Sequence, residues 1–184
     1  MPGRTLAVPG LRTLFPALCT LYPALMRTIT EDLDGSQLSI AIAVARFNTL
    51  VTERLLAGAL EALAECGVEE SRTVVAWVPG SFELAFTARR LAESGRFDAV
   101  ICLGCVIKGE TDHNEYINRE AARGIAEAGE STGVPAIFGV ITPNSLEQAL
   151  ARVPEGPANK GYEVALSAVT MANLRRRLRE LATD

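Results

Sequence analysis

The stretch AVICLGCVIKGETDH (99–113) decides how the chain folds. It begins with a run of apolar and small residues (99–105), which is typical of a strand buried on both faces of a parallel sheet. A glycine and several polar residues follow, and a helical pattern starts at the only histidine of the chain, His113. Open α/β sheets place their chemistry just beyond the carboxyl ends of strands. The stretch therefore predicts both a sheet and a candidate site.

The same order of strand and helix repeats along the rest of the chain. We expect strands at 36–45, 73–78, 99–105 and 134–142. We expect helices from Asn48, as N-cap, to Gly67, from the Pro79-Gly80-Ser81 turn to about Ser94, from about His113 to Glu130, from Ser145 to Arg152, and from about Lys160 to Leu181. Four alternations of strand and helix predict a four-stranded parallel sheet with helices on both faces, which is a three-layer α/β/α domain.

The first residues of the chain differ from the rest. No acidic residue precedes Glu31, and prolines recur throughout this part. The apolar run at 14–26 is broken twice by proline, so it predicts neither a stable helix nor a membrane span. We interpret residues 1–28 as an extension that is disordered or lies upstream of a native start at Met26, and residues 29–184 as the folded domain.

Composition excludes several classes of partner. The chain has 18 basic and 22 acidic residues and a net charge of -4, whereas nucleic-acid-binding domains carry a basic stripe. The one dense basic run, Arg175–Arg177 with Arg179, fits the solvated end of the last helix, where cations favour the helix dipole. We therefore expect neither a nucleic acid nor a membrane as partner.

Four cysteines are present, of which Cys102 and Cys105 form a C-x-x-C. This spacing occurs in redox pairs and in halves of zinc sites. The sequence has no second such pair, and both cysteines fall at the end of a strand that we expect to be buried. We interpret them as small apolar core residues of a protein in the reducing cytoplasm, with no metal site.

Three turns leave the carboxyl ends of the first three strands, at 46–48, 79–83 and 108–113. In a parallel sheet these turns open onto the same edge. Phe47 in the first turn could stack on a ligand or belong to the core. Glu83 in the second could bind a ligand or simply favour the start of its helix.

The third turn carries the most specific pattern. Gly109 lets the backbone come close to a ligand, and Asp112 is expected to cap the next helix in a capping box with Glu115. The amides left free around residues 110 and 111 suit a phosphate. His113, in the first helical turn, is expected to stay neutral and accept a proton, the alternative being an ordinary surface histidine. Arg152 and Lys160, at the break before the last helix, could hold an anion together.

Seven motifs occur in a defined order: ARFN (45–48), VPGSFEL (78–84), LGCVIKGETDH (103–113), VPAIFGVIT (134–142), LEQALAR (146–152), NKG (159–161) and MANL (171–174). From about Ile29 onward the chain thereby resembles the 6,7-dimethyl-8-ribityllumazine synthases. The resemblance implies a flavodoxin-like doubly wound fold and a transferase activity. That family condenses 5-amino-6-(D-ribitylamino)uracil with 3,4-dihydroxy-2-butanone 4-phosphate in riboflavin biosynthesis, releasing phosphate and water, with no metal or organic cofactor.

The resemblance also implies roles for individual residues. His113 would transfer protons, and Arg152 and Lys160 would act beside the phosphate. The residues implied in binding the pyrimidine and its ribityl chain are Phe47, Gly80, Ser81, Phe82, Glu83, Cys105, Val106, Ile107 and Phe138, the last from a neighbouring subunit. The residues implied in binding the phosphate are Gly109, Glu110, Thr111 and Arg152. The chain departs from the family pattern at Ala85, Asp112 and Thr170, and none of these changes removes a catalytic group.

The resemblance further implies a homopentamer whose active sites lie between subunits. Residues 152–160 have the length found in members that assemble twelve pentamers into a 60-subunit shell, so we expect a shell, with riboflavin synthase as a candidate cargo. Two other functions stay open from the sequence: a flavin or lumazine carrier without turnover, and a shell protein whose main role is to enclose cargo.

Overall fold

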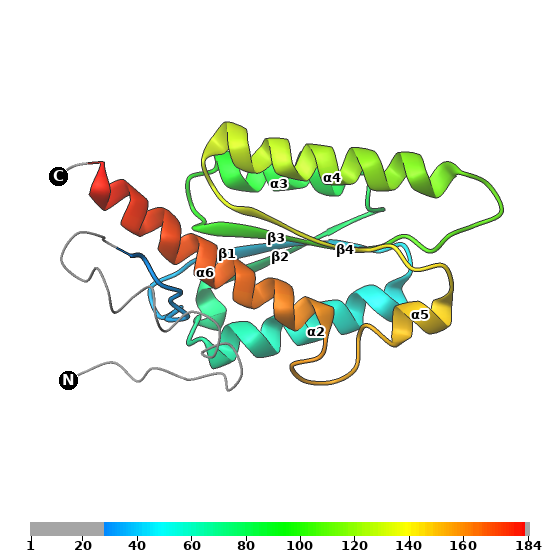
Figure 1. Ribbon diagram of the computed structural model, residues 1–184, viewed down its shortest axis with the longest axis horizontal. Coiled ribbons are helices and arrows are strands. Elements are labelled where there is room, and N and C mark those ends of the chain that lie inside the picture. Colours follow the sequence, from blue (N-terminus) through cyan, green and yellow to red (C-terminus); the bar gives the residue numbers. More distant parts are fainter. Residues whose placement is uncertain (1–27, 183–184) are drawn as a thin grey trace, which may run out of the picture. The chain divides into compact units, whose positions relative to one another are not determined.

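Four parallel strands form a sheet in the order β2-β1-β3-β4 (Figure 1). They are β1 (Ile40–Ala45), β2 (Thr73–Val78), β3 (Ala99–Cys105) and β4 (Ala136–Ile141). β1 pairs with β2 and β3, and β3 pairs with β4. The computed structural model describes residues 28–182. Over that range the sheet is the four-stranded parallel one that the sequence predicts.

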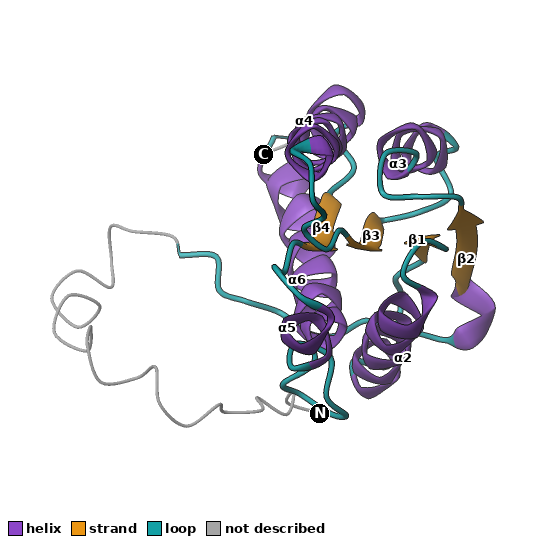
Figure 2. Ribbon diagram, turned by 90° about the vertical axis from the view of Figure 1, so that its right-hand side faces the viewer, coloured by secondary structure: helices purple, strands orange, loops and turns teal. Residues whose placement is uncertain are grey.

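Helices follow each strand and cover both faces of the sheet. They are α2 (Thr49–Glu65), α3 (Leu84–Glu93), α4 (His113–Thr132), α5 (Leu146–Leu150) and α6 (Lys160–Leu181), and a 3-10 helix, η1 (Glu70–Arg72), precedes β2. Figure 2 shows α3 and α4 on one face and α2, α5 and α6 on the other. The predicted three-layer, flavodoxin-like architecture is therefore confirmed.

The central strand β1 packs against the helices on both faces of the sheet. Its branched residues Ile40, Ile42 and Val44 lie in a core cluster with α2 and α6. The alanines between them lie in a second cluster with α3 and α4. Every residue of β1 is inaccessible to solvent. Because side chains alternate between faces along a strand, this sequence places large residues against one helical layer and small ones against the other.

The first strand begins at Ile40, later than the predicted residue 36. Ser36 N–H donates to Asp34 Oδ1 at 3.0 Å and closes a turn there. Gly35 N–H donates to the Cys66 carbonyl at 2.7 Å, which ties the turn to the end of α2. Aspartate, glycine and serine satisfy their backbone in such turns, so they displace the strand. The fourth strand is also shorter than predicted at both ends.

From Glu31 onward the chain forms one compact unit. Residues 1–27 lie outside the described range, so the expectations for the N-terminal extension stay predictions. Between residues 28 and 182, no helix has both the length and the apolar character needed to cross a membrane.

Candidate active site

The turns after β1, β2 and β3, at 46–48, 79–83 and 108–113, are the first, second and third strand exits. They meet at one pocket beyond the carboxyl ends of these strands. The pocket has a volume of about 420 Å³. Its lining residues are Phe47, Gly80, Ser81, Phe82, Glu83, Cys105, Val106, Ile107, Gly109, Thr111, His113, Asn114 and Ile117. The convergence expected from a parallel sheet is therefore present, and it gathers an aromatic ring, hydroxyls, a carboxylate and an imidazole around an apolar wall.

The first exit is hydrogen-bonded to the second exit and to the end of β3. Phe47 N–H donates to the Pro79 carbonyl at 3.1 Å, which joins it to the second exit. Asn48 has φ 61° and donates its Nδ2–H to the Cys105 carbonyl at 2.8 Å, which joins it to the end of β3. The expectation that the Asn48 side chain caps α2 is wrong, because the amide is used in this cross-strand bond. Phe47 is 69% exposed, so it is not a core residue.

The second exit places two polar side chains, Ser81 and Glu83, just before α3. Ser81 is buried, and its Oγ would lie 2.5 Å from a Cβ placed on Gly104 of β3. Glu83 Oε2 accepts the Gly80 N–H at 2.9 Å, so its carboxylate is held over the turn. The turn is longer than expected, and α3 begins only at Leu84.

The third exit runs beside β4 before it reaches α4. Val106 N–H donates to the Ile141 carbonyl at 2.9 Å, and Lys108 N–H to the Pro143 carbonyl at 3.0 Å. The chain then crosses residues 109–112 without further regular pairing and enters α4 at His113, whose imidazole is exposed.

Asp112 is the N-cap residue of α4, as expected, but the predicted capping box with Glu115 is wrong. Its side chain makes no cap hydrogen bond, and Glu115 N–H donates to the Asp112 main-chain carbonyl at 3.0 Å instead. With no side chain closing the helix start, the first amides of α4 keep their capacity to bind an anion.

Both cysteines of the C-x-x-C are buried in β3 and free. Burial raises the pKa of the Cys102 thiol to about 12 and that of the Cys105 thiol to about 11, because it disfavours the thiolate. Their interpretation as small core residues is confirmed. Among residues 28–182 no cluster of three or more histidine, cysteine or acidic side chains could hold a metal ion.

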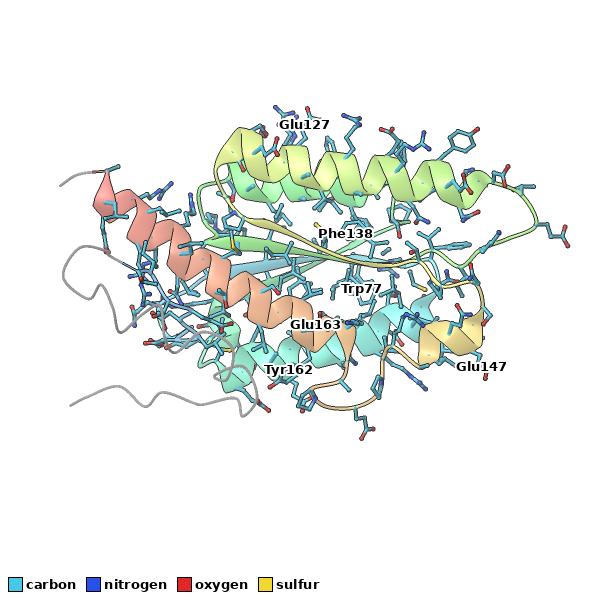
Figure 3. The ribbon with its side chains drawn as sticks, in the orientation of Figure 1. Trp77, Glu127, Phe138, Glu147, Tyr162 and Glu163 are labelled. Carbon is cyan, nitrogen blue, oxygen red and sulfur yellow. The ribbon has the colours of Figure 1, made fainter. Side chains whose placement is uncertain are left out.

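Four predicted site residues do not line this pocket: Glu110, Phe138, Arg152 and Lys160. Glu110 is exposed in the third exit. Phe138 lies on β4 and is 41% exposed (Figure 3). A single chain therefore does not assemble the whole predicted site.

Arg152 and Lys160 nevertheless lie beside each other at the junction of α5 and α6. Lys160 N–H donates to the Arg152 carbonyl at 3.0 Å. Arg152 Nη1 donates to the Gln148 carbonyl at 2.7 Å, and Lys160 Nζ pairs with Glu163, which Figure 3 labels near the start of α6. The two residues predicted to share an anion are thus neighbours through their backbones, while their charged groups bind different partners in the single chain.

Asn159 holds this junction, and the sequence analysis overlooked it. Its side chain is almost fully buried, donates to the Arg54 and Pro154 carbonyls at 2.9 Å each, and accepts the Gly161 N–H at 2.8 Å as N-cap of α6. An asparagine directly before the helical pattern was the available signal.

Comparison with known protein families matches residues 37–176 to 6,7-dimethyl-8-ribityllumazine synthase. The chain belongs to this family. The match spans every residue of the pocket and the α5–α6 junction, and it confirms the resemblance drawn from the seven motifs. It covers most of the compact unit and leaves residues 1–36 and 177–184 outside the match to the lumazine synthase family.

Two pocket residues, Asn114 and Ile117, are absent from the set expected for a lumazine synthase. The helical periodicity of the sequence could have predicted both residues. The buried residues of α4 are Ala121, Ile125 and Ala128, and the same face continues back through the first turns of the helix to the pocket.

Proposed function

We propose that this protein condenses 5-amino-6-(D-ribitylamino)uracil with 3,4-dihydroxy-2-butanone 4-phosphate to form 6,7-dimethyl-8-ribityllumazine. The observation that supports it most is the pocket, in which three strand exits of a lumazine synthase family member bring Phe47, Glu83 and His113 together. The amine and the ketone first form a Schiff base with loss of water. Phosphate then leaves, and the ring closes with loss of a second water.

The pyrimidine ring fits the apolar side of the pocket. Phe47 is exposed at its rim and can stack on a planar ring. Val106 and Ile107 also line the pocket, and the protonated thiol of Cys105 adds no charge there. The ribityl chain then reaches Ser81 and Glu83, where a buried hydroxyl and a held carboxylate can bind its hydroxyl groups.

The phosphate substrate fits the third exit. Gly109 and Thr111 line the pocket at the open start of α4, where backbone amides and the helix dipole favour an anion. Glu110 contributes its backbone amide there. His113 stands at the same helix start and moves protons between the amine, the hydroxyl groups of the second substrate and water. No metal or organic cofactor takes part in this scheme.

A second subunit completes the site. Both edges of the sheet expose apolar side chains, Val74 and Trp77 on β2 and Phe138 on β4. Two different edges that fit each other form head-to-tail contacts, which close into a ring. In such a homopentamer Phe138 of one subunit covers the pocket of the next, and Arg152 and Lys160 approach its phosphate. Twelve pentamers then form a 60-subunit shell in the cytoplasm, with riboflavin synthase as a candidate cargo.

The test is turnover by the purified protein, followed through the fluorescence of the lumazine product. We expect a rate well above the uncatalysed condensation. His113→Ala should lower kcat about 100-fold while the pyrimidine still binds, because a general acid–base group is lost. Arg119→Ala, on an exposed part of α4, is the matched control and should leave the rate unchanged. Pyrimidine binding without turnover would favour the carrier hypothesis instead.

A further inference from the structure

The function proposed above gives no task to Asn114, although this residue lines the pocket. Its Oδ1 is buried, and no described residue donates a hydrogen bond to it. Leaving a buried acceptor unpaired costs free energy, because the desolvation of the acceptor is not compensated by a hydrogen bond. Folded proteins pair nearly all such atoms, so an unpaired one on a cavity wall indicates a group that a ligand completes.

The position of Asn114 follows from the packing of α4 on α3. The two helices meet closely at Gly124, where an added Cβ would lie 2.6 Å from the Ala85 Cβ. An α-helix rises 1.5 Å per residue, so Asn114 lies about 15 Å from Gly124, toward the N-terminus of α4. Figure 1 shows α4 extending past the start of α3 toward the carboxyl edge of the sheet. The first turn of α4 thereby reaches the pocket, which residues 80–83 also line.

Asn118 provides an internal comparison. It lies one helical turn after Asn114, and its Oδ1 is also buried without a partner among the described residues. It does not line the pocket. Of these two similar amides, only Asn114 is therefore within reach of a ligand.

The chemistry of the amide selects the ligand group. Asn114 has an unpaired acceptor, Oδ1, and a donor, Nδ2, on the same carboxamide, and a hydroxyl both donates and accepts. Ser81 and Glu83, the groups assigned above to the ribityl chain, line the same pocket as Asn114. We propose that Asn114 binds a hydroxyl group of the ribityl chain and is a specificity-determining residue for the polyol. This inference rests on the proposed function, because it takes the pyrimidine substrate as the ligand.

The test compares two pyrimidines by calorimetry on the intact protein, without the second substrate. One is 5-amino-6-(D-ribitylamino)uracil, and the other carries a methyl group in place of the ribityl chain. Asn114→Ala should weaken binding of the ribityl compound about tenfold and leave the methyl analogue unchanged. Phe47→Ala should weaken both, since the ring is common to them. Asn118→Ala should change neither.

Stability gives a second readout that a structural role would not produce. Asn114→Leu removes an unpaired polar atom, so the melting temperature should stay the same or rise while ribityl binding falls. Equal losses for both pyrimidines, no loss for either, or a lower melting temperature for Asn114→Leu would each overturn the assignment. Because binding is measured apart from turnover, a wild-type protein that binds the pyrimidine but does not react would refute the proposed function alone. A wild-type protein that binds neither compound would refute both.

Discussion

The Asn48 side chain donates to the Cys105 carbonyl at 2.8 Å and joins the exit of β1 to the last residue of β3. The β1–β3 ladder itself ends at Val44 and Leu103. The side-chain amide therefore continues the pairing of the two strands after their backbones have separated. It thereby ties the residue after Phe47 to the residue before Val106 and Ile107, and all three of these side chains line the pocket.

Two substitutions of Asn48 separate the effect of this hydrogen bond on stability from the effect of the left-handed backbone conformation. Asn48→Gly keeps the φ of 61° without strain but loses the bond, and we expect unfolding to become easier by about 1 kcal/mol. Asn48→Ala loses the bond and must also hold a left-handed conformation, which adds about 1 kcal/mol. Urea unfolding of both variants measures the difference. Equal stability of the two variants would show that the left-handed backbone does not matter.

The contact of α6 with α2 predicts a severe effect at Gly161. An added Cβ there would lie 1.9 Å from the Leu55 carbonyl oxygen, which is backbone and cannot swing away. We expect Gly161→Ala to destabilise the fold by about 3 kcal/mol, because the helices must separate. Gly109→Ala is the control, since nothing lies within 4 Å of an added Cβ there. Thermal unfolding checks both, and a Gly161→Ala variant as stable as the control would contradict the close packing.

The buried thiols predict how stability changes in alkali. The pKa of Cys102 rises from 9.0 to about 12 on folding, so the folded state keeps its proton where the unfolded state loses it. Stability from this group is complete below about pH 9 and falls as the pH rises toward 12. Cys102→Ala should make the decline shallower between pH 9 and 11, as measured by urea unfolding at each pH. An unchanged slope would remove the thiol from the explanation.

The same burial predicts which cysteines react in the native protein. Cys66 is partly exposed, whereas Cys102 and Cys105 are buried. Iodoacetamide at neutral pH should label Cys66 first and reach the other two only after unfolding, since alkylation requires an accessible thiolate. Peptide mapping by mass spectrometry identifies each site and separates them from Cys19. Early labelling of Cys105 would contradict the protonated wall of the pocket.

Trp77 can report the proposed assembly. It is the only tryptophan of the chain and is 36% exposed on the edge strand β2, with the Arg46 guanidinium carbon 5.7 Å from its ring centroid. If β2 contacts a neighbouring subunit, Trp77 becomes buried, and its emission should shift to the red when the assembly is diluted or dissociated. Sedimentation velocity on the same samples gives the mass. A monomer at all concentrations would contradict the pentamer. The absence of a 60-subunit mass at high concentration would contradict the shell.

The sequence alone was sufficient for the order of elements and for the edge of the sheet that carries the pocket. The alternation of branched residues and alanines over 40–45 predicts a strand between two helical layers, because period two is a property of the extended backbone itself. The polar turns after each strand then have to converge, because parallel strands end at one edge. That reasoning places Phe47, Ser81, Glu83 and His113 near one another from the sequence alone.

Tertiary structure decided what local pattern could not. Asn48 and Asp112 were expected to cap helices with their side chains. The Asn48 amide instead binds the end of a strand 57 residues away, and the Asp112 side chain makes no cap bond. Local sequence does not reveal a partner that is distant along the chain. The significance of Asn114 depends on tertiary structure, because only the packing of α4 makes it a pocket residue with a buried, unpaired oxygen. Spacing along the chain determines which side chains an element can present. Only the packing of elements determines which polar atoms are left for a ligand.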